Sequence, residues 1–272
     1  MSVPINTGIK HLNNQKHIIL KQLIIYRLNN FSVSVVMPQP IPPNYMAYDR
    51  TIVVFSPDGR LLQVEYARQM VKNGSTSAGI RLKDAVVLAG LKISAPLAVK
   101  ESFKKIYEID DHVAAAFSGS VSDARDLVEM ARIKAQINRI TYGEPISVST
   151  VTQYISDRKH LVTQYAGVRP YGVGMLIGGF DANGPRLYET DPSGTMIEWL
   201  AQVIGRGAEK SKKMLTSGYK ENMDIAGGIK LLTNVLKAGE KTVSPESIEV
   251  VIIKKDGITK LSGAEIKKYT AQ

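Results

Sequence analysis

Short apolar runs bounded by turn residues recur along most of this chain. Many are rich in Val, Ile, Leu and Ala and are flanked by Gly, Asp, Asn or Pro, which is typical of buried strands. The pattern predicts strands at 75–82, 85–91, 105–109, 112–118, 173–181, 186–189, 196–204 and 248–253, with a short strand near Ile258. A further run at 51–55 also has a β-like composition.

Other segments carry apolar residues at helical spacing. They predict helices at 60–72, 120–141, 147–165, 208–219 and 224–237, and a terminal helix from Ala264. Ser56 to Gly59 reads Ser-Pro-Asp-Gly, which favours a type I turn before the first helix. The order is strands, two helices, strands, two helices, strand. It lacks strict β-α alternation, so we expect an α+β fold of two packed antiparallel sheets with helices on both outer faces.

The predicted helix at 120–141 has two apolar stripes. The first consists of Ala124, Leu127, Val128, Ala131 and Ala135, and the second of Met130, Ile133, Ile137 and Ile140. One stripe is enough to dock a helix on a sheet. The second stripe therefore indicates either contact with another subunit or a single wide core face.

The composition changes near residue 45. Residues 1–44 contain four basic residues and no acidic residue, and the segment ends in a proline-rich run at 38–43. Three interpretations remain open for residues 1–45: a disordered tail, a small added element, or upstream sequence translated from a wrongly assigned start. We favour the last, with the native chain beginning at or after Met37, and expect one continuous domain at 46–272.

The composition of the 272-residue chain excludes several kinds of site. There is no cysteine, which removes disulfides and thiolate chemistry and fits a cytoplasmic protein. The four histidines are scattered, so we expect no metal and no cofactor. No apolar run reaches the length of a membrane span. The net charge of +10 raises the hypothesis of nucleic-acid binding, but the basic residues are interspersed with acids, which favours an ordinary mixed surface.

One segment carries many fixed positions in a short stretch. It reads YDR at 48–50, FSPDGRL at 55–61 and QVEYA at 63–67. Further matching positions are GST at 74–76, SG at 118–119, DAR at 123–125, TYG at 141–143, GVRPYG at 167–172 and DPSGT at 191–195. Together they resemble the α-type subunits of the proteasome, in the simple form found in archaea, over about residues 46–272.

The resemblance implies a four-layer αββα sandwich of the N-terminal-nucleophile hydrolase type. It also implies a seven-membered α ring, stacked on rings of catalytic β subunits, that admits unfolded polypeptides through an axial gate. Neither nucleic acid nor a membrane is an expected partner. The family pattern has only a few residues before Tyr48, so a native segment of 1–45 would crowd that gate.

The serious alternative is a catalytic β-type subunit of the same fold. By similarity its nucleophile falls at Ser75, which would need a free α-amine as its base. Ser75 instead follows a predicted helix, and the supporting acid falls near Leu91, which carries no charge. We therefore expect a non-catalytic chain.

The resemblance also assigns roles to single residues. The gate positions are Tyr48, Asp49, Arg50, Pro57 and Tyr66; the pocket for the C-terminal tails of an activating AAA ATPase ring is Lys105, Gly74, Glu65 and Leu61; and the pore constriction is Tyr142 and Gly143. Lys104 precedes the pocket lysine, so an offset of one position is open. Without the resemblance, Pro57 is simply a turn residue, Tyr66 a packed core residue, and either lysine a surface charge.

Overall fold

The computed structural model describes residues 53–92, 97, 99, 102–240 and 243–271. Its centre consists of two five-stranded antiparallel sheets. Sheet A has the order β10-β9-β2-β1-β8 and sheet B the order β3-β4-β5-β6-β7. The strands of sheet A are β1 (Ser77–Arg81), β2 (Val86–Leu91), β8 (Ala201–Ile204), β9 (Ile248–Lys254) and β10 (Gly257–Leu261). Those of sheet B are β3 (Ile106–Asp110), β4 (Val113–Gly119), β5 (Val173–Asp181), β6 (Gly184–Thr190) and β7 (Met196–Glu198).

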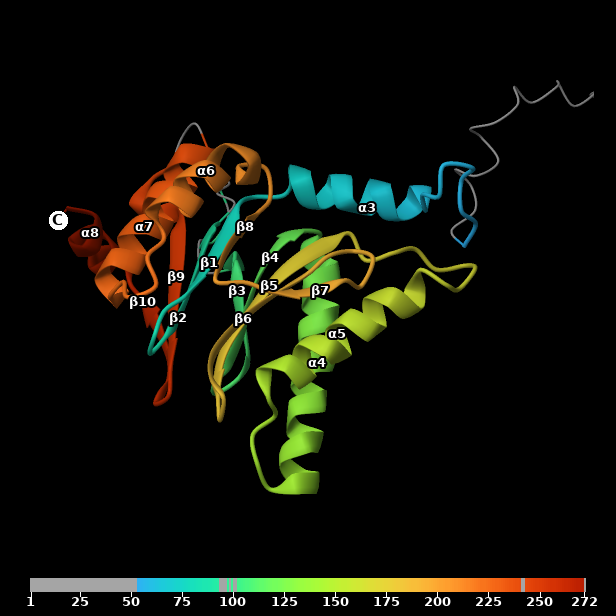
Figure 1. Cartoon of the computed structure of the whole chain (residues 1–272), viewed down its shortest axis with the longest axis horizontal. Coiled ribbons are helices and arrows are strands. Elements are labelled where there is room, and N and C mark those ends of the chain that lie inside the picture. Colours follow the sequence, from blue (N-terminus) through green and yellow to red (C-terminus); the bar gives the residue numbers. More distant parts are fainter. Residues whose placement is uncertain (1–52, 93–96, 98, 100–101, 241–242, 272) are drawn as a thin grey trace, which may run out of the picture. The chain divides into compact units, whose positions relative to one another are not determined.

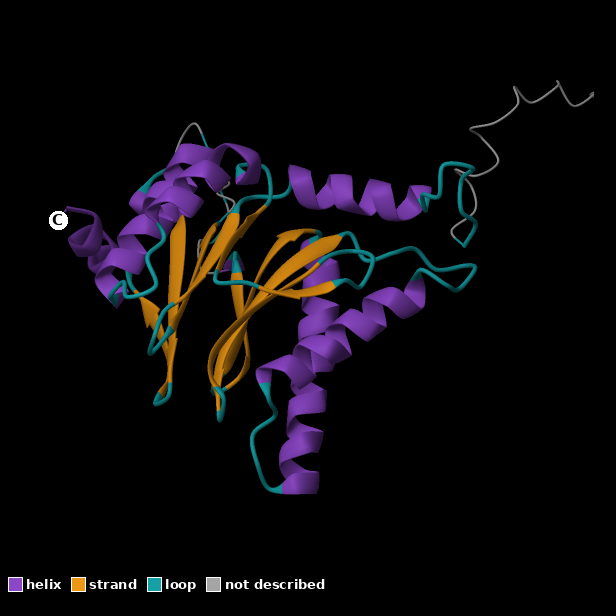
Figure 2. Cartoon of the chain, in the orientation of Figure 1, coloured by secondary structure: helices purple, strands orange, loops and turns teal. Residues whose placement is uncertain are grey.

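Helices cover the outer faces of both sheets, as Figure 1 and Figure 2 show. The helices are α3 (Leu62–Asn73), α4 (Val121–Tyr142), α5 (Val148–Val162), α6 (Ala208–Gly218), α7 (Ile225–Gly239) and α8 (Gly263–Ala271), with a 3₁₀ turn at Pro245–Ser247. The pair α4 and α5 packs on sheet B, whereas α6, α7 and α8 lie on the side of sheet A. Helix α3 lies across one end of the sandwich and contacts β4 and β5. The predicted four-layer α+β fold is confirmed.

Strand β2 shows how the sequence specifies these layers. All six of its residues are buried, because each of its faces meets an apolar layer. Val87 and Ala89 belong to the core beneath α7, whereas Val86 and Leu88 face the core between the sheets. Since successive side chains of a strand point to opposite faces, one apolar run serves both layers.

The prediction of one strand at 196–204 was wrong. Met196–Glu198 pairs with β6 in sheet B, and Ala201–Ile204 pairs with β1 in sheet A. Trp199 and Leu200 make the crossing: the Trp199 amide donates to Leu187 O at 2.9 Å, and Leu200 O accepts from the Arg81 amide at 2.7 Å. Each half is strand-like, so the apolar run alone cannot reveal the change of sheet.

The predicted run at 51–55 does not form a strand where it is described. Residues 53–55 have no strand pairing, and 51–52 lie outside the described residues. The turn that follows is confirmed, since the Gly59 amide donates to Ser56 O at 2.8 Å and Gly59 has φ +76°. This turn leads directly into α3.

Helix α4 begins and ends as its sequence indicates. The Ser120 hydroxyl accepts from the Asp123 amide, and Gly143 ends the helix in the left-handed conformation at φ +73°. The first apolar stripe is fully buried on sheet B. In the second stripe, Ile133 is 54% and Ile140 84% exposed, which excludes a single wide core face within this chain.

Two glycines with positive φ provide a test of this packing. Gly119 has φ +108°, and a Cβ there would lie 2.2 Å from Gly172 O, whereas a Cβ at Gly143 would meet nothing within 4 Å. We expect Gly143→Ala to lower the free energy of unfolding by about 1–2 kcal/mol through backbone strain. Gly119→Ala adds a backbone collision and should cost at least about 3 kcal/mol. Urea unfolding at matched protein concentration measures both, and equal costs would contradict the described approach of Gly119 to Gly172.

Candidate functional site

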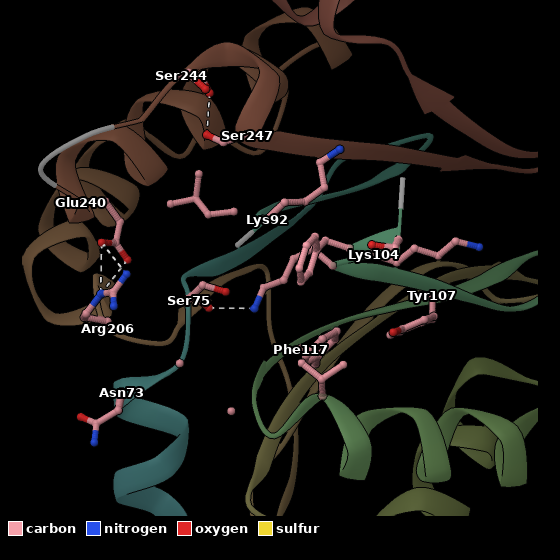
Figure 3. Close-up of a pocket in the computed structure, with 17 residues that line it drawn as sticks. Asn73, Ser75, Lys92, Lys104, Tyr107, Phe117, Arg206, Glu240, Ser244 and Ser247 are labelled. Carbon is pink, nitrogen blue, oxygen red and sulfur yellow. Dashed lines mark hydrogen bonds and ion pairs between the residues drawn. The ribbon is translucent and has the colours of Figure 1, made fainter. Parts of the chain in front are cut away.

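A cavity of about 570 Å³ opens where the C-terminal end of α3 meets both sheets. Figure 3 shows it between the α3 terminus, β4 and the segment after α7. Its described lining is Asn73, Gly74, Ser75, Leu91, Lys92, Ser102, Phe103, Lys104, Lys105, Tyr107, Phe117, Gly119, Val121, Arg206, Glu240, Ser244 and Ser247. We call this cavity the α3 pocket.

Lys105 forms the centre of the α3 pocket. It immediately precedes β3 and is only 4% exposed. Its Nζ donates to Ser75 O at 2.9 Å, the bond drawn at Ser75 in Figure 3, and lies 4.5 Å from the centroid of the Phe117 ring. A cation over an aromatic face is stabilised by the ring quadrupole. The described residues place no carboxylate within ion-pair distance of this amine.

Burial is the main cause of a large change in the acidity of Lys105. Loss of hydration, and after it the charge of Arg206, lower its pKa, whereas Glu240 and Glu249 oppose the change; the net effect takes the pKa from 10.5 to about 7. Near neutral pH this amine is therefore divided between its charged and neutral forms.

Glu249 of β9 fixes the backbone of Lys105. It is 2% exposed, and its Oε2 accepts from the Lys105 amide at 2.8 Å. Its Oε1 pairs with Lys260 of β10. Because β9 is in sheet A and β3 in sheet B, this carboxylate links the two sheets at the pocket wall. Ser77 makes a second link, since its Oγ donates to Phe117 O at 2.7 Å.

The opposite wall of the α3 pocket is held by Arg206. Its guanidinium pairs with Glu240, which caps the C-terminus of α7, at 2.9 Å, as Figure 3 shows. Its amide donates to Gly74 O at 2.8 Å and so fixes the end of α3. Glu240 also accepts from the Thr76 hydroxyl at 3.1 Å. The Glu240 carboxylate is thus already engaged.

The described lining favours an anionic ligand. Lys92, Lys104, Lys105 and Arg206 are basic and Glu240 is acidic. The side chains of Leu91, Phe103, Phe117 and Val121 add an apolar part. Such a lining fits a ligand in which an anionic group is attached to an apolar group. Lys104 is exposed and its amine points away from Ser75 in Figure 3, so Lys105 is the buried lysine of the two.

The predicted pocket residues do not all meet within one chain. Gly74 lies in the α3 pocket beside Lys105. Leu61 and Glu65 lie at the opposite end of α3, and a helix of 12 residues spans about 18 Å. There Glu65 accepts from Arg68, whose guanidinium also pairs with Asp191 at 2.8 Å. This pairing attaches the middle of α3 to the loop between β6 and β7.

Ser75 lacks the environment of an activated nucleophile. It follows α3 within a continuous chain, and its carbonyl oxygen is the acceptor for Lys105. Leu91, where an acid was considered, is a buried apolar residue at 6% exposure. The peptide nitrogen of Ser75 is not a basic amine, so it cannot take the hydroxyl proton.

The predicted gate and pore residues lie elsewhere. Tyr48, Asp49 and Arg50 fall outside the described residues. Pro57 lies in the exposed turn before α3, and Tyr66 on α3 is 53% exposed, so it is not a core residue of this chain. Tyr142 is 72% exposed at the end of α4, next to Gly143.

Sequence reasoning missed Arg206, Glu240 and Phe117, because they reach the pocket only through tertiary packing. The sequence holds one local signal of the turn that carries Arg206, namely the run Gly205-Arg206-Gly207. In the structure, Gly205 has φ +101°.

In the part of the chain that is described, no group of three or more acidic or histidine side chains could hold a metal ion. No helix in that part is long and apolar enough to cross a membrane.

The position of Lys105 generates a prediction about pH. Its pKa is about 7 when folded and 10.5 as an ordinary lysine, so between these values the unfolded chain holds a proton that the folded chain has released. The free energy of unfolding then rises with pH, by up to about 1.4 kcal/mol per pH unit. Subtracting the unfolding free energy of Lys105→Met from that of the unchanged chain should isolate this slope between pH 7 and about 9.5. A difference independent of pH would contradict the burial of this amine.

Comparison with known proteins agrees with this architecture. The model of the proteasome subunit family matches residues 71–253, and the N-terminal signature of the A-type proteasome subunits matches 48–69. The proteasome alpha subunit of Methanocaldococcus jannaschii is 47% identical over 233 residues, which cover 85% of this chain and 88% of that protein. The corresponding protein of Methanosarcina acetivorans is 46% identical over 231 residues, 84% of this chain and 94% of that protein. The chain therefore belongs to the proteasome subunit family, and within it to the α type.

Proposed function

We propose that this chain forms the outer ring of a proteasome core particle, gates the entry of unfolded polypeptides, and receives the C-terminal tails of an activating ATPase ring. The observation that carries the docking part is Lys105, a buried cation in the wall of the α3 pocket that is bonded only to a neutral carbonyl among the described residues. Membership of the α type makes the chain a non-catalytic component of a protease complex. A cytoplasmic location belongs to the same proposal.

A head-to-tail ring would explain why the pocket residues are divided between the two ends of α3. Leu61 and Glu65 lie at one end, whereas Gly74 and Lys105 lie at the other. In a closed ring of heterologous contacts, one subunit presents its first end to the second end of its neighbour. Seven such contacts would make seven composite pockets. Exposed apolar residues of α3, such as Met70 at 48%, support burial against a neighbour.

The exposed stripe of α4 supports a second contact surface. Ile133, Ile137 and Ile140 lie on one helix and are each more than half exposed. Exposed apolar side chains gathered in this way indicate a protein interface. We assign this stripe to the assembled particle, in which β subunits stack against the α ring.

Docking of a tail would follow from the chemistry of Lys105. A terminal carboxylate can replace the Ser75 carbonyl as its acceptor, and the new charge-assisted bond favours the ammonium form. The apolar side chains of the α3 pocket can cover the tail's last residues. Several such contacts around one ring add by multivalency, so each pocket needs only modest affinity.

The gate and pore assignments rest on exposure and position. Pro57 fixes the turn before α3, and Tyr66 is exposed on the same helix. Together with Tyr48, Asp49 and Arg50 they would hold the segment before α3 in its open arrangement. Tyr142 and Gly143 form an exposed helix end that would narrow the inner pore.

Substitution of Lys105 tests the docking proposal. We expect Lys105→Ala to abolish stimulation of peptide hydrolysis by a C-terminal tail peptide of an ATPase ring, because each pocket loses about 1.5–3 kcal/mol of charge-assisted binding. The measurement compares the α/β complex with and without the tail peptide, and native electrophoresis checks ring assembly. Lys104→Ala is the matched control and should retain stimulation. Normal stimulation of the Lys105→Ala complex would remove the pocket assignment.

The non-catalytic assignment is tested with the purified chain. We expect ring-shaped oligomers in electron micrographs and no peptide hydrolysis until a β subunit is added, because Ser75 has no free amine beside it. Hydrolysis by the pure chain that disappears in Ser75→Ala would contradict this assignment.

A further inference from the structure

Among the described residues, Lys105 and Lys159 both have buried amines, and their surroundings differ. Lys159 of α5 is 0% exposed, and its Nζ donates to three oxygens: Val173 O, Thr190 O and Thr190 Oγ1. Lys105 donates to one oxygen and lines a cavity of about 570 Å³. Burial lowers the pKa of each lysine to about 7. A neutral amine is the nucleophilic form of lysine, and of these two only Lys105 also lines a described cavity.

The charged groups around Lys105 come from four directions: Arg206 before α6, Glu240 after α7, Glu249 of β9, and the adjacent Lys104. Glu240 pairs with Arg206, and Glu249 pairs with Lys260. Both carboxylates therefore have cationic partners other than the Lys105 amine.

The stem of Lys105 is fixed by packing. A Cβ placed at Gly90 of β2 would lie 2.5 Å from Lys105 Cγ, so the glycine makes room for this side chain. The Lys105 amide is held by Glu249, which fixes the other end of the stem. The amine is thus presented at a defined point of the pocket wall, while the hydrogen bond to Ser75 O is its one described polar contact.

We propose that Lys105 is a site of N-acylation by small anionic acyl donors of the acyl phosphate class. The basic side chains of Lys92, Lys104 and Arg206 line the same cavity and favour entry of such a donor. The neutral amine attacks the carbonyl carbon, an N–C bond forms, and the C–O bond to phosphate breaks. Phosphate leaves with the electron pair, and the nitrogen loses a proton to water. No oxidant, reductant or metal is needed.

Acylation would change the electrostatics of the α3 pocket. The product amide is neutral and cannot regain the charge, so the central cation is lost while Arg206 stays paired with Glu240. This consequence rests on the proposed function: an acylated pocket would no longer bind a tail carboxylate. The modification would therefore switch off activation without removing the ring.

The test uses the full-length, assembled chain and acetyl phosphate as the probe at pH 7.5. Proteolytic digestion and mass spectrometry follow the acetylated fraction of each lysine with time. Lys105 should react at least about fivefold faster than Lys104 or Lys92, because burial in the cavity wall lowers its pKa to about 7 and leaves much of its amine neutral at pH 7.5. Lys159 is the matched control: its amine is buried with the same lowered pKa, but it is fully enclosed and should stay unmodified in the folded chain.

The possible results of this experiment distinguish failure of the acylation site from failure of the docking proposal. Acetylation of Lys105 no faster than that of Lys104 would overturn the inference. Rapid acetylation of Lys159 alongside Lys105 would also overturn it, because the cavity would then not be the cause. In the Lys105→Arg variant, the rapid acetylation at position 105 should disappear, while the circular dichroism spectrum stays unchanged. If Lys105 is acetylated fast yet tail stimulation persists, the acylation site stands and the docking proposal fails.

Discussion

Face-to-face packing of the two sheets is the constraint on which the other features depend. The layer between them is apolar and includes Val86, Leu88, Leu176 and Leu187, all fully buried. Gly79 and Gly178 let the sheets approach, since a Cβ at either would fall within 3 Å of a facing side chain. Because burial of apolar area is the main favourable term in folding, this layer fixes how the sheets align.

That alignment creates the α3 pocket. It places Lys105, just before β3 of sheet B, beside two residues of the other side. Glu249 belongs to β9 of sheet A, and Ser75 lies just before β1 of the same sheet. The few polar groups at this edge then bond across the sheets, as Ser77 does to Phe117. The buried cation at Lys105 is thus an effect of sheet packing, and its chemistry follows from loss of water.

The sequence predicted the elements that depend on local pattern. Strands such as Val173–Asp181 and the turn ending at Gly59 depend on neighbours in the chain, and both were confirmed. The crossing at Trp199 was not predictable, because both sides of it have strand composition. The burial of Lys105 was also beyond local pattern, since a lysine beside another lysine is normally exposed. The resemblance to the proteasome family singled out Lys105, but its lowered pKa and its hydrogen bond to the Ser75 carbonyl arise only from tertiary packing.

The strand orders carry a consequence for the order of folding. Sheet B is built from strands that follow one another in the chain, from β3 to β7, so its pairings close short loops apart from the insertion of α4 and α5. Sheet A joins β2 to β9 and β1 to β8, which brings together segments from the two ends of the domain. Closing such distant pairs costs more chain entropy and is slow. During synthesis, sheet B can therefore form while sheet A still waits for the C-terminal third of the chain, and Lys105 acquires its contact with Glu249 only at that last step.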